Sequence, residues 1–228
     1  MAEISALNRM TKAQCTVDNL TVLFEDDALI VCVKPRGIIS QKDCNGGISM
    51  ISLLSEKCGC DIFPLHRLDR EVGGVMVYAK TKTAAAFLSE EIRQHRFVKE
   101  YIAVVHSKPQ EPVGEMRDLL FKDSRKNKSF VVKRERKGVK EARLEYELLQ
   151  TFNIEENEYS KVLIKLHTGR THQIRVQFAS RKMPLVADKK YGANDNFKNI
   201  GLWSYKITFT HPKSRQEMSF FSEPQFEL

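Results

Sequence analysis

Hydrophobic and polar positions along the chain predict short strands interleaved with helices. Two apolar runs, Ala28 to Val33 and Gly74 to Ala79, are edged by charged residues or glycine, which is typical of buried strands. Residues Ala142 to Leu148 alternate apolar and polar side chains, the pattern of a half-buried strand. Further strands are expected at Lys99 to Val105, Lys161 to His167 and Tyr205 to Phe209.

Two segments carry apolar residues at helical spacing. The first runs from Thr83 to His95, with Thr83 as the candidate N-cap. The second runs from Thr171 to Lys182 and places Ile174 and Phe178 on one face. The helices and strands follow no regular βαβ period, and several strands are joined by short links. We therefore expect an α+β fold with a mixed, largely antiparallel sheet flanked by helices and loops.

Length and composition predict one globular domain. The chain has 228 residues, of which 42% are hydrophobic and 9% aromatic, enough apolar material for a folded core. We expect a short N-terminal extension over residues 1–19 and a single domain over residues 20–228. No run approaches the roughly 20 apolar residues of a membrane-spanning helix, and the start has no secretory pattern. The expected protein is soluble, cytoplasmic and not bound to a membrane.

Neither the cysteines nor the histidines predict a metal site. The five cysteines include Cys58-Gly-Cys60, which lacks the second pair of a zinc site with spaced cysteines, so free thiols are expected. His66 and His172 could be combined with acidic residues into a site, but no local metal-binding spacing is present. We expect no metal.

Positive charge is concentrated in one segment, residues Lys122 to Arg143, which we name the basic arm. The chain carries 37 basic and 29 acidic residues, a net charge of +8, and the basic arm alone holds a surplus of seven. Ser129 to Val132 is a candidate hairpin partner for the strand at Ala142 to Leu148, with the turn near Lys137-Gly138. Such an arm suits an anionic partner, although a solvated loop that serves only solubility stays possible from these residues alone.

Three polar segments interrupt apolar strands and are the candidates for chemistry. They are His66 to Asp69, Lys99 to Tyr101, and Thr168 to Gln173. Asp69 precedes a glycine-rich turn beside a buried strand, where a carboxylate can be ionised, fixed and accessible, although a plain turn or N-cap role is the alternative. An arginine within ~4 to 6 Å would lower the pKa of such a carboxyl group by about 1 to 3 units, and Arg170 is the candidate.

These same segments carry a resemblance to a known family. The stretch HRLDREVGGVMVYAK resembles the H-R-L-D-x-x-T-S-G signature of the RluA-type pseudouridine synthases. The stretch LHTGRTHQIRVQFASRKMPLVADKKYG resembles their second signature, and four shorter blocks match in the same order. The similarity covers about Leu20 to the C-terminus. The segment before it is shorter than the S4-type RNA-binding domain of many relatives.

The resemblance implies an isomerase that converts uridine in structured RNA into pseudouridine, without metal or redox cofactor. It makes Asp69 the catalytic aspartate, Tyr101 the tyrosine that stacks on the target uracil, and Arg170 the arginine paired with the aspartate. Arg67 would occupy the space left by the extruded base. The expected RNA-binding residues are completed by His66, His172, Gln173, Lys133, Arg134, Arg136 and Lys137.

The chemistry of these residue types agrees with that function. Breaking a glycosidic bond builds positive charge on the sugar, so Asp69 could stabilise that charge, trap the sugar covalently or remove a ribose proton. Flipping a stacked uridine out of a helix costs a few kcal/mol. Stacking on Tyr101, worth about 1 to 3 kcal/mol per base, would offset part of that cost.

Two departures from the family pattern keep a rival open. Val72-Gly73-Gly74 stands where the family has T-S-G, and Lys182 and Ala187 replace two usual glycines. The rival is a non-catalytic RNA-binding or ribosome-assembly factor with the same fold. A hydrolase is disfavoured because no second carboxylate or nucleophile stands at motif spacing. Ribosomal and transfer RNA both stay open as the substrate, and a monomer is expected.

Overall fold

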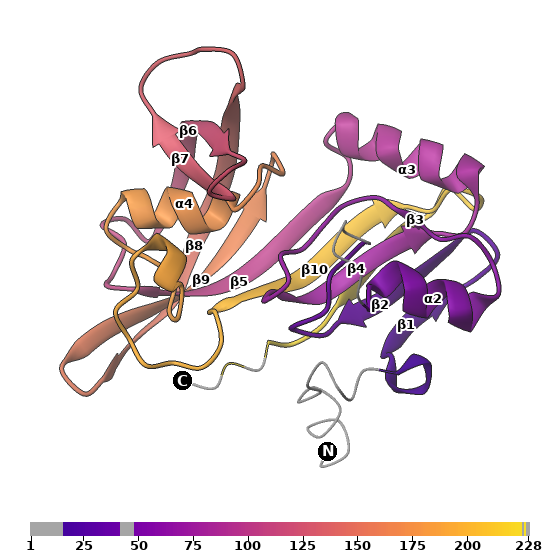
Figure 1. Ribbon diagram of the computed structural model, residues 1–228, viewed down its shortest axis with the longest axis horizontal. Coiled ribbons are helices and arrows are strands. Elements are labelled where there is room, and N and C mark those ends of the chain that lie inside the picture. The colour runs from indigo at the N-terminus through magenta and orange to yellow at the C-terminus, as the bar shows by residue number, and fades with distance from the viewer. Residues whose placement is uncertain (1–15, 42–47, 225, 227–228) are drawn as a thin grey trace. The chain divides into compact units, whose positions relative to one another are not determined.

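The computed structural model describes residues 16–41, 48–224 and 226, which form two compact units (Figure 1). The first unit comprises residues up to Lys99 together with Ser204–Gln225, and the second comprises Glu100–Trp203 with the last residues. The chain passes between units within β5 (Val98–His106) and within β10 (Leu202–Thr210). Most of the predicted extension lies outside the described residues, and the single domain over residues 20–228 stays a prediction.

The first unit is built on strands in the order β1-β2-β4-β10. Their bounds are β1 (Val22–Glu25), β2 (Leu29–Lys34) and β4 (Gly73–Ala79), with β3 (Phe63–Pro64) paired to β4 and β11 (Glu217–Phe221) paired to β10. The pairings β1–β2, β2–β4, β3–β4 and β10–β11 are antiparallel. Every residue of β2 and β4 is buried, which explains why both read as continuous apolar runs.

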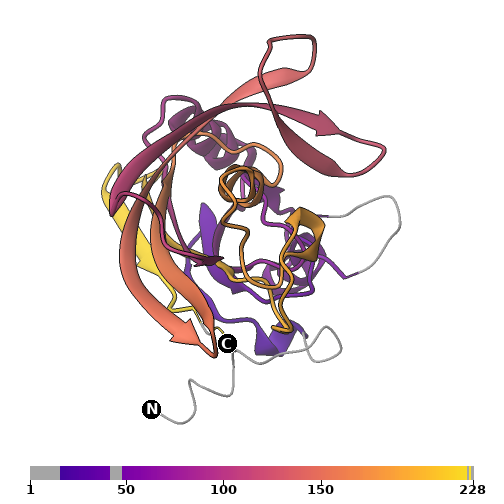
Figure 2. The same ribbon diagram turned by 90° about the vertical axis from the view of Figure 1, so that its left-hand side faces the viewer.

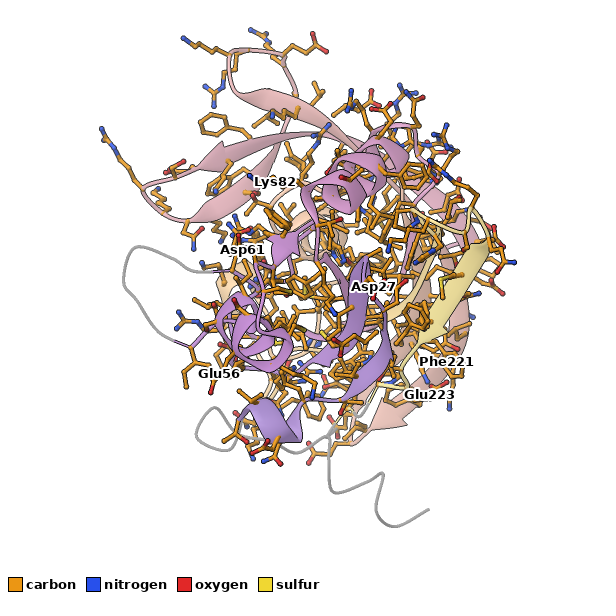
Figure 3. All side chains as sticks on the ribbon, turned by 90° about the vertical axis from the view of Figure 1, so that its right-hand side faces the viewer. Asp27, Glu56, Asp61, Lys82, Phe221 and Glu223 are labelled. Atoms are coloured by element: carbon orange, nitrogen blue, oxygen red, sulfur yellow. The ribbon has the colours of Figure 1, made fainter. Side chains whose placement is uncertain are left out.

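Two helices and a short 3₁₀ turn, η2 (Val17–Asn19), complete this unit. Helix α2 (Met50–Cys58) begins at a capping box in which Ser49 and Ser52 satisfy each other's backbone N–H groups. Helix α3 (Lys82–Arg93) contributes Leu88 to a core that includes the stacked rings of Phe97 and Phe209. Figure 3 shows Glu56 on α2 and Lys82 at the first residue of α3.

The predicted N-cap of α3 was wrong by two residues. Thr81, not Thr83, has extended backbone angles and accepts a hydrogen bond from the N–H of Ala84 at 3.1 Å. Both threonines offer the same hydroxyl, and the helix begins at the first one because β4 ends at Ala79 and the chain turns immediately. Thr83 therefore lies inside the first helical turn.

The second unit holds the strands β5-β9-β8-β6-β7 in that order. Their bounds are β6 (Val113–Asp123), β7 (Lys128–Val132), β8 (Val139–Ile154) and β9 (Asn157–Leu166). The pairings β6–β7, β6–β8 and β8–β9 are antiparallel. Helix α4 (Gln173–Ser180) buries Ile174 and Phe178, as the sequence predicts, and the short η3 (Lys189–Tyr191) follows it.

The predicted hairpin within the basic arm was wrong in its partner. β7 pairs with β6 rather than with β8, and β8 pairs with the other edge of β6. The side chain of Asp123 causes the difference, because its Oδ1 accepts hydrogen bonds from the N–H groups of Arg125 and Lys126 at 2.9 and 3.1 Å. This Asx-type turn folds β7 back onto β6. The segment around Lys137-Gly138 therefore connects strands that are not neighbours.

Candidate active site

The turn that carries Asp69 is held on its C-terminal side by a buried lysine. Lys34, at the end of β2, is fully buried. Its Nζ donates hydrogen bonds to the carbonyl oxygens of Pro35, Ile38 and Arg70 at 2.9, 2.6 and 3.2 Å. Three acceptors offset the cost of burying an ammonium group. The backbone next to Asp69 is thereby tied to the turn after β2.

A serine holds the other side of the same turn. The Oγ of Ser40 accepts a hydrogen bond from the N–H of Leu68 and donates one to the carbonyl oxygen of the same residue, both at 3.0 Å. Within the turn, the N–H of Val72 donates to the carbonyl oxygen of Asp69 at 3.1 Å. Asp69 is half-buried. Its carboxylate is therefore carried by backbone that is hydrogen-bonded on both sides.

Of the glycines that follow Asp69, Gly74 stands where a side chain would clash with the neighbouring backbone. This residue has φ = 121°, and a Cβ atom built on it would lie 2.2 Å from the carbonyl oxygen of Ser204. The Oγ of Ser204 donates to the carbonyl oxygen of Val75 at 2.9 Å, so β4 and β10 approach closely here. Val72, one of the departures from the family pattern, is buried. An apolar residue at that position therefore packs into the unit.

His66 is half-buried, and its ring nitrogens are covered and neutral. Both ring nitrogens are covered and, within the described residues, neither has a hydrogen-bond partner. Burial, with the nearby charge of Lys99, lowers the pKa of His66 to about 3. The Phe97 ring lies 5.8 Å away, centroid to centroid. Burial also lowers the pKa of Lys99, while Arg67 is exposed. At neutral pH this environment disfavours a charged contact between His66 and a phosphate.

In the second unit, the loop before α4 carries Arg170. Its Nε donates to the carbonyl oxygen of Glu141 at 2.8 Å, and its backbone N–H donates to Oε1 of Gln173 at 3.0 Å. That oxygen also accepts from Oγ1 of Thr168 at 2.8 Å, and Nε2 of Gln173 donates to the carbonyl oxygen of Arg143 at 3.1 Å. Gln173 is 3% exposed. Its side chain braces the loop internally, and its contact with RNA stays a prediction.

His172 and Tyr101 occupy constrained positions in the same unit. His172 has left-handed backbone angles, φ = 53° and ψ = 28°, and its Nδ1 lies 2.9 Å from the hydroxyl oxygen of Tyr191. Tyr101, on β5, is 5% exposed. Tyr191 was not singled out from the sequence, and only its place in the closing D-K-K-Y-G stretch pointed toward it.

The four predicted phosphate-binding residues of the basic arm are exposed. Lys133, Arg134, Arg136 and Lys137 all lie in the connection between β7 and β8. The guanidinium of Arg136 lies 4.6 Å from the centroid of the Phe121 ring, which orients it. In Figures 1 and 2 the β6–β7 hairpin and this connection reach out beyond α4. The charge surplus is therefore accessible to a large anionic partner.

The predicted catalytic residues come from both units. Asp69 belongs to the first unit, whereas Tyr101 and Arg170 belong to the second. Their roles, and the pairing of Asp69 with Arg170, stay predictions.

A separate cavity of about 760 Å³ in the second unit contains none of the predicted site residues. His106 and Asp195 line it, with Nε2 and Oδ2 2.7 Å apart. The Asp195 carboxylate also accepts hydrogen bonds from the N–H groups of Ala187 and Phe197. These bonds tie the loop after η3 to the end of β5.

The described residues contain free thiols and no cluster of metal ligands. Among the residues that the structure describes, no group of three or more histidine, cysteine or acidic side chains could hold a metal ion. Cys32, Cys58 and Cys60 are free thiols, while Cys15 and Cys44 lie outside the described residues. Across residues 16–41, 48–224 and 226, no helix combines the length and apolar character that crossing a membrane requires.

Comparison with known proteins decides the family. A family model described as RNA pseudouridylate synthase matches residues 28–180, which include Asp69, Tyr101 and Arg170. The chain belongs to the RNA pseudouridylate synthase family. The family resemblance read from the sequence motifs is thereby confirmed.

Relatives within the RNA pseudouridylate synthase family are similar over most of the chain. A ribosomal large subunit pseudouridine synthase C of Buchnera aphidicola is 32% identical over 206 residues, covering 85% of this chain and 63% of the relative. A ribosomal large subunit pseudouridine synthase D of Borreliella burgdorferi is 33% identical over 208 residues, covering 82% and 60%. The chain thus spans about three-fifths of the length of these two relatives.

A solved structure of the RNA pseudouridylate synthase family has the same fold. The human RNA pseudouridylate synthase domain containing 1 superposes with a TM-score of 0.76 at 21% identity, covering 92% of this chain and 85% of that one. The α+β expectation is confirmed by this likeness and by the antiparallel pairings within each unit.

Proposed function

We propose that this protein is an RNA pseudouridine synthase that isomerises uridines in structured ribosomal RNA. The observation that carries the proposal is the family match over residues 28–180, which contains the positions of the proposed aspartate, tyrosine and arginine. The names of the two bacterial relatives, which refer to the large ribosomal subunit, support ribosomal RNA as the substrate class. Transfer RNA is the alternative substrate, and we expect the enzyme to act as a monomer.

The proposed reaction breaks one bond and forms another on the same ribose. The bond from the sugar to the uracil nitrogen breaks, the uracil turns, and carbon 5 bonds to the sugar carbon that the nitrogen left. The hydrogen of carbon 5 leaves as a proton, and the freed nitrogen gains one, so no oxidant or reductant is needed. Asp69 is the proposed carboxylate at the sugar, where positive charge develops. Its fixed turn, held by Lys34 and Ser40, supports that role.

The remaining proposed residues prepare the nucleotide. Tyr101 is the stacking platform for the extruded uracil, which requires an aromatic ring fixed on a strand. Arg170 is the proposed partner of Asp69, and the Gln173 amide that holds its backbone supports a defined position for it. Arg67 is exposed, as a residue that takes the place of an extruded base must be. Lys133, Arg134, Arg136 and Lys137 are the proposed phosphate contacts.

The test replaces the carboxylate alone. In Asp69→Asn the neutral amide has the same shape but cannot stabilise or trap a cationic sugar, so we expect turnover to fall by on the order of 10³-fold or more. RNA affinity should change by less than about threefold because phosphate contacts dominate binding. The measurement is tritium released from carbon 5 of uridine in a labelled large-subunit ribosomal RNA transcript, with labelled transfer RNA alongside.

The controls separate loss of chemistry from loss of folding or binding. Circular dichroism and a filter-binding isotherm on the same preparations should match those of the wild type. Wild-type turnover by Asp69→Asn would refute the role of the carboxylate. A folded wild-type protein that binds both RNAs and releases no tritium from either would refute the enzymatic proposal.

A further inference from the structure

The hydroxyl group of Tyr191 joins three segments that are far apart in the sequence. Tyr191 ends η3 and is 9% exposed. Its hydroxyl oxygen accepts a hydrogen bond from the N–H of Ser129, on β7, at 2.8 Å. The same oxygen lies 2.9 Å from Nδ1 of His172, the residue before α4. One side-chain atom thus connects the basic arm, the loop of Arg170 and the turn after α4.

These hydrogen bonds hold the ring of His172 beside the hydroxyl group of Tyr191. A backbone N–H can only donate, so the Ser129 amide uses a lone pair of the Tyr191 oxygen. The oxygen keeps a second lone pair as well as its hydrogen, so it can pair with Nδ1 of His172 in either direction, according to the tautomer of the ring. In both directions the hydroxyl group of Tyr191 fixes the position of the imidazole ring.

Further contacts tie the start of β7 to the same place. The Oγ of Ser129 donates to the carbonyl oxygen of Thr171 at 2.6 Å. Nζ of Lys128 donates to the carbonyl oxygen of Lys190 at 2.5 Å and lies 4.9 Å from the centroid of the Tyr191 ring. The basic arm is thus attached at its base to the residues that follow Arg170.

The ring of Tyr191 is held independently of its hydroxyl group. Arg175 forms a two-bond ion pair with Asp188, at 2.7 and 2.8 Å, and its guanidinium lies 5.2 Å from the ring centroid. The backbone N–H of Tyr191 donates to the carbonyl oxygen of Asp188 at 2.9 Å. Replacing the tyrosine by phenylalanine therefore removes the hydroxyl contacts while leaving the reasons for the ring's position in place.

The backbone at His172 needs such support. A residue with a Cβ atom is disfavoured in the left-handed region, and His172 has φ = 53°. Strained residues of this kind persist only where surrounding contacts over-determine them. The Tyr191 hydroxyl on the ring and the Ser129 hydroxyl on the preceding carbonyl are two such contacts.

We propose that Tyr191 is a positioning residue for the isomerisation. Its hydroxyl locks His172, and with it the Arg170–Thr171–His172 turn, to the start of β7. This keeps the basic arm, which is proposed to hold the RNA, in a defined position relative to Arg170, the proposed partner of Asp69. This role rests on the proposed synthase function and deepens it.

The central experiment compares Tyr191→Phe with the wild type. We expect kcat on the large-subunit ribosomal RNA transcript to fall by about tenfold or more, because a small displacement of a catalytic group is costly. The RNA dissociation constant should stay within about twofold. Tyr159→Phe is the matched control, since Tyr159 is a buried tyrosine of the same unit outside this network, and its kcat should be unchanged. Circular dichroism establishes that each variant is folded.

Two further measurements separate positioning from a general loss of structure. In nitrogen-15 spectra of labelled histidine, the Nδ1 signal of His172 should shift in Tyr191→Phe, because that nitrogen loses its contact with the hydroxyl group. In a His172→Ala background, Tyr191→Phe should change kcat by less than about twofold, because the hydroxyl acts through the imidazole.

The outcomes are distinct. A folded Tyr191→Phe with wild-type kcat, a loss explained entirely by weaker RNA binding, or effects that multiply in the double variant would overturn the positioning role. Asp69→Asn is measured in the same assay. If it keeps wild-type turnover, the proposed function fails; if it is inactive while Tyr191→Phe is fully active, only the role of Tyr191 fails.

Discussion

His66 shows how burial decides what a single residue can do. Its ring nitrogens are covered and the pKa is lowered to about 3, against an ordinary value near 6.5 in the unfolded chain. Between these values the unfolded state binds a proton that the folded state does not. Stability therefore rises with pH across this window and is lost as the pH falls from about 6.5 toward 3.

Replacing His66 by phenylalanine should remove this part of the pH dependence. We expect the wild type to lose about 1 kcal/mol more of its unfolding free energy than His66→Phe when the pH falls from 6 to 5. Urea unfolding followed by circular dichroism at several pH values measures both proteins. Parallel pH profiles would show that the imidazole is protonated in the folded state.

Individual site residues differ in how far the sequence could reveal them. Asp69 and Arg170 are charged groups in glycine-containing turns, and their positions stand out because charge is costly next to apolar strands. Tyr191 could not be found in this way. An aromatic residue after two lysines has the same pattern whether it fills a core or holds a histidine, and only its contacts with Ser129 and His172 separate the two.

At the scale of elements, the sequence predicts strands whose residues are all apolar or alternate between apolar and polar. It does not predict which strands pair with each other. β2 and β4 lie within one residue of their predicted positions because their apolar character is local to the sequence. The pairing of β7 depends on the Asp123 side chain capping a turn, which competes with the equally plausible turn at Lys137-Gly138. Local pattern cannot rank those two turns, because the contacts that accompany the observed pairing are tertiary: Val131 of β7 packs against the cluster that contains Leu120 and Ala142.

The close approach of β4 to Ser204 makes Gly74 irreplaceable within its element. Gly74→Ala should lower the unfolding free energy by more than about 3 kcal/mol or prevent folding, because the new methyl group meets backbone 2.2 Å away and φ is positive. Gly59→Ala is the control. Gly59 also has positive φ but nothing within 4 Å of the added atom, so the cost should be about 1 to 2 kcal/mol. Thermal melts measure both, and equal losses would exclude the steric explanation.

At the scale of the whole molecule, charge is distributed unevenly. The net charge of +8 is almost entirely the surplus of the basic arm, and four of its exposed basic residues, Lys133, Arg134, Arg136 and Lys137, lie in one connection. This placement was predictable from sequence because charge runs are local. A site that combines Asp69 with Tyr101 and Arg170 could not be predicted from spacing, since the residues stand in separate segments. The family resemblance alone suggests it, and it stays a proposal.

Charge reversal of Lys133, Arg134, Arg136 and Lys137 to glutamate should weaken RNA binding and flatten its salt dependence. Each lost phosphate contact reduces the slope of log K against log salt by about 0.7 to 0.9. The control reverses Lys57, Lys82, Arg93 and Lys213, which are exposed residues of the first unit, and gives the same net charge. Filter binding at salt concentrations from about 50 to about 300 mM measures the slope for both variants. Equal slopes for the two variants would remove the basic arm from the RNA interface.

The hydrogen bonds on both sides of the Asp69 turn affect which residue types the positions next to it can hold. Lys34 donates a hydrogen bond to the carbonyl oxygen of Arg70, and Ser40 donates one to that of Leu68, so both anchors use main-chain atoms of the turn. Hydrogen bonds to the main chain do not depend on which side chain a residue carries. Having Val72-Gly73 where the family pattern has Thr-Ser therefore leaves both anchors of the Asp69 turn intact, so these positions can differ without moving the proposed catalytic carboxylate.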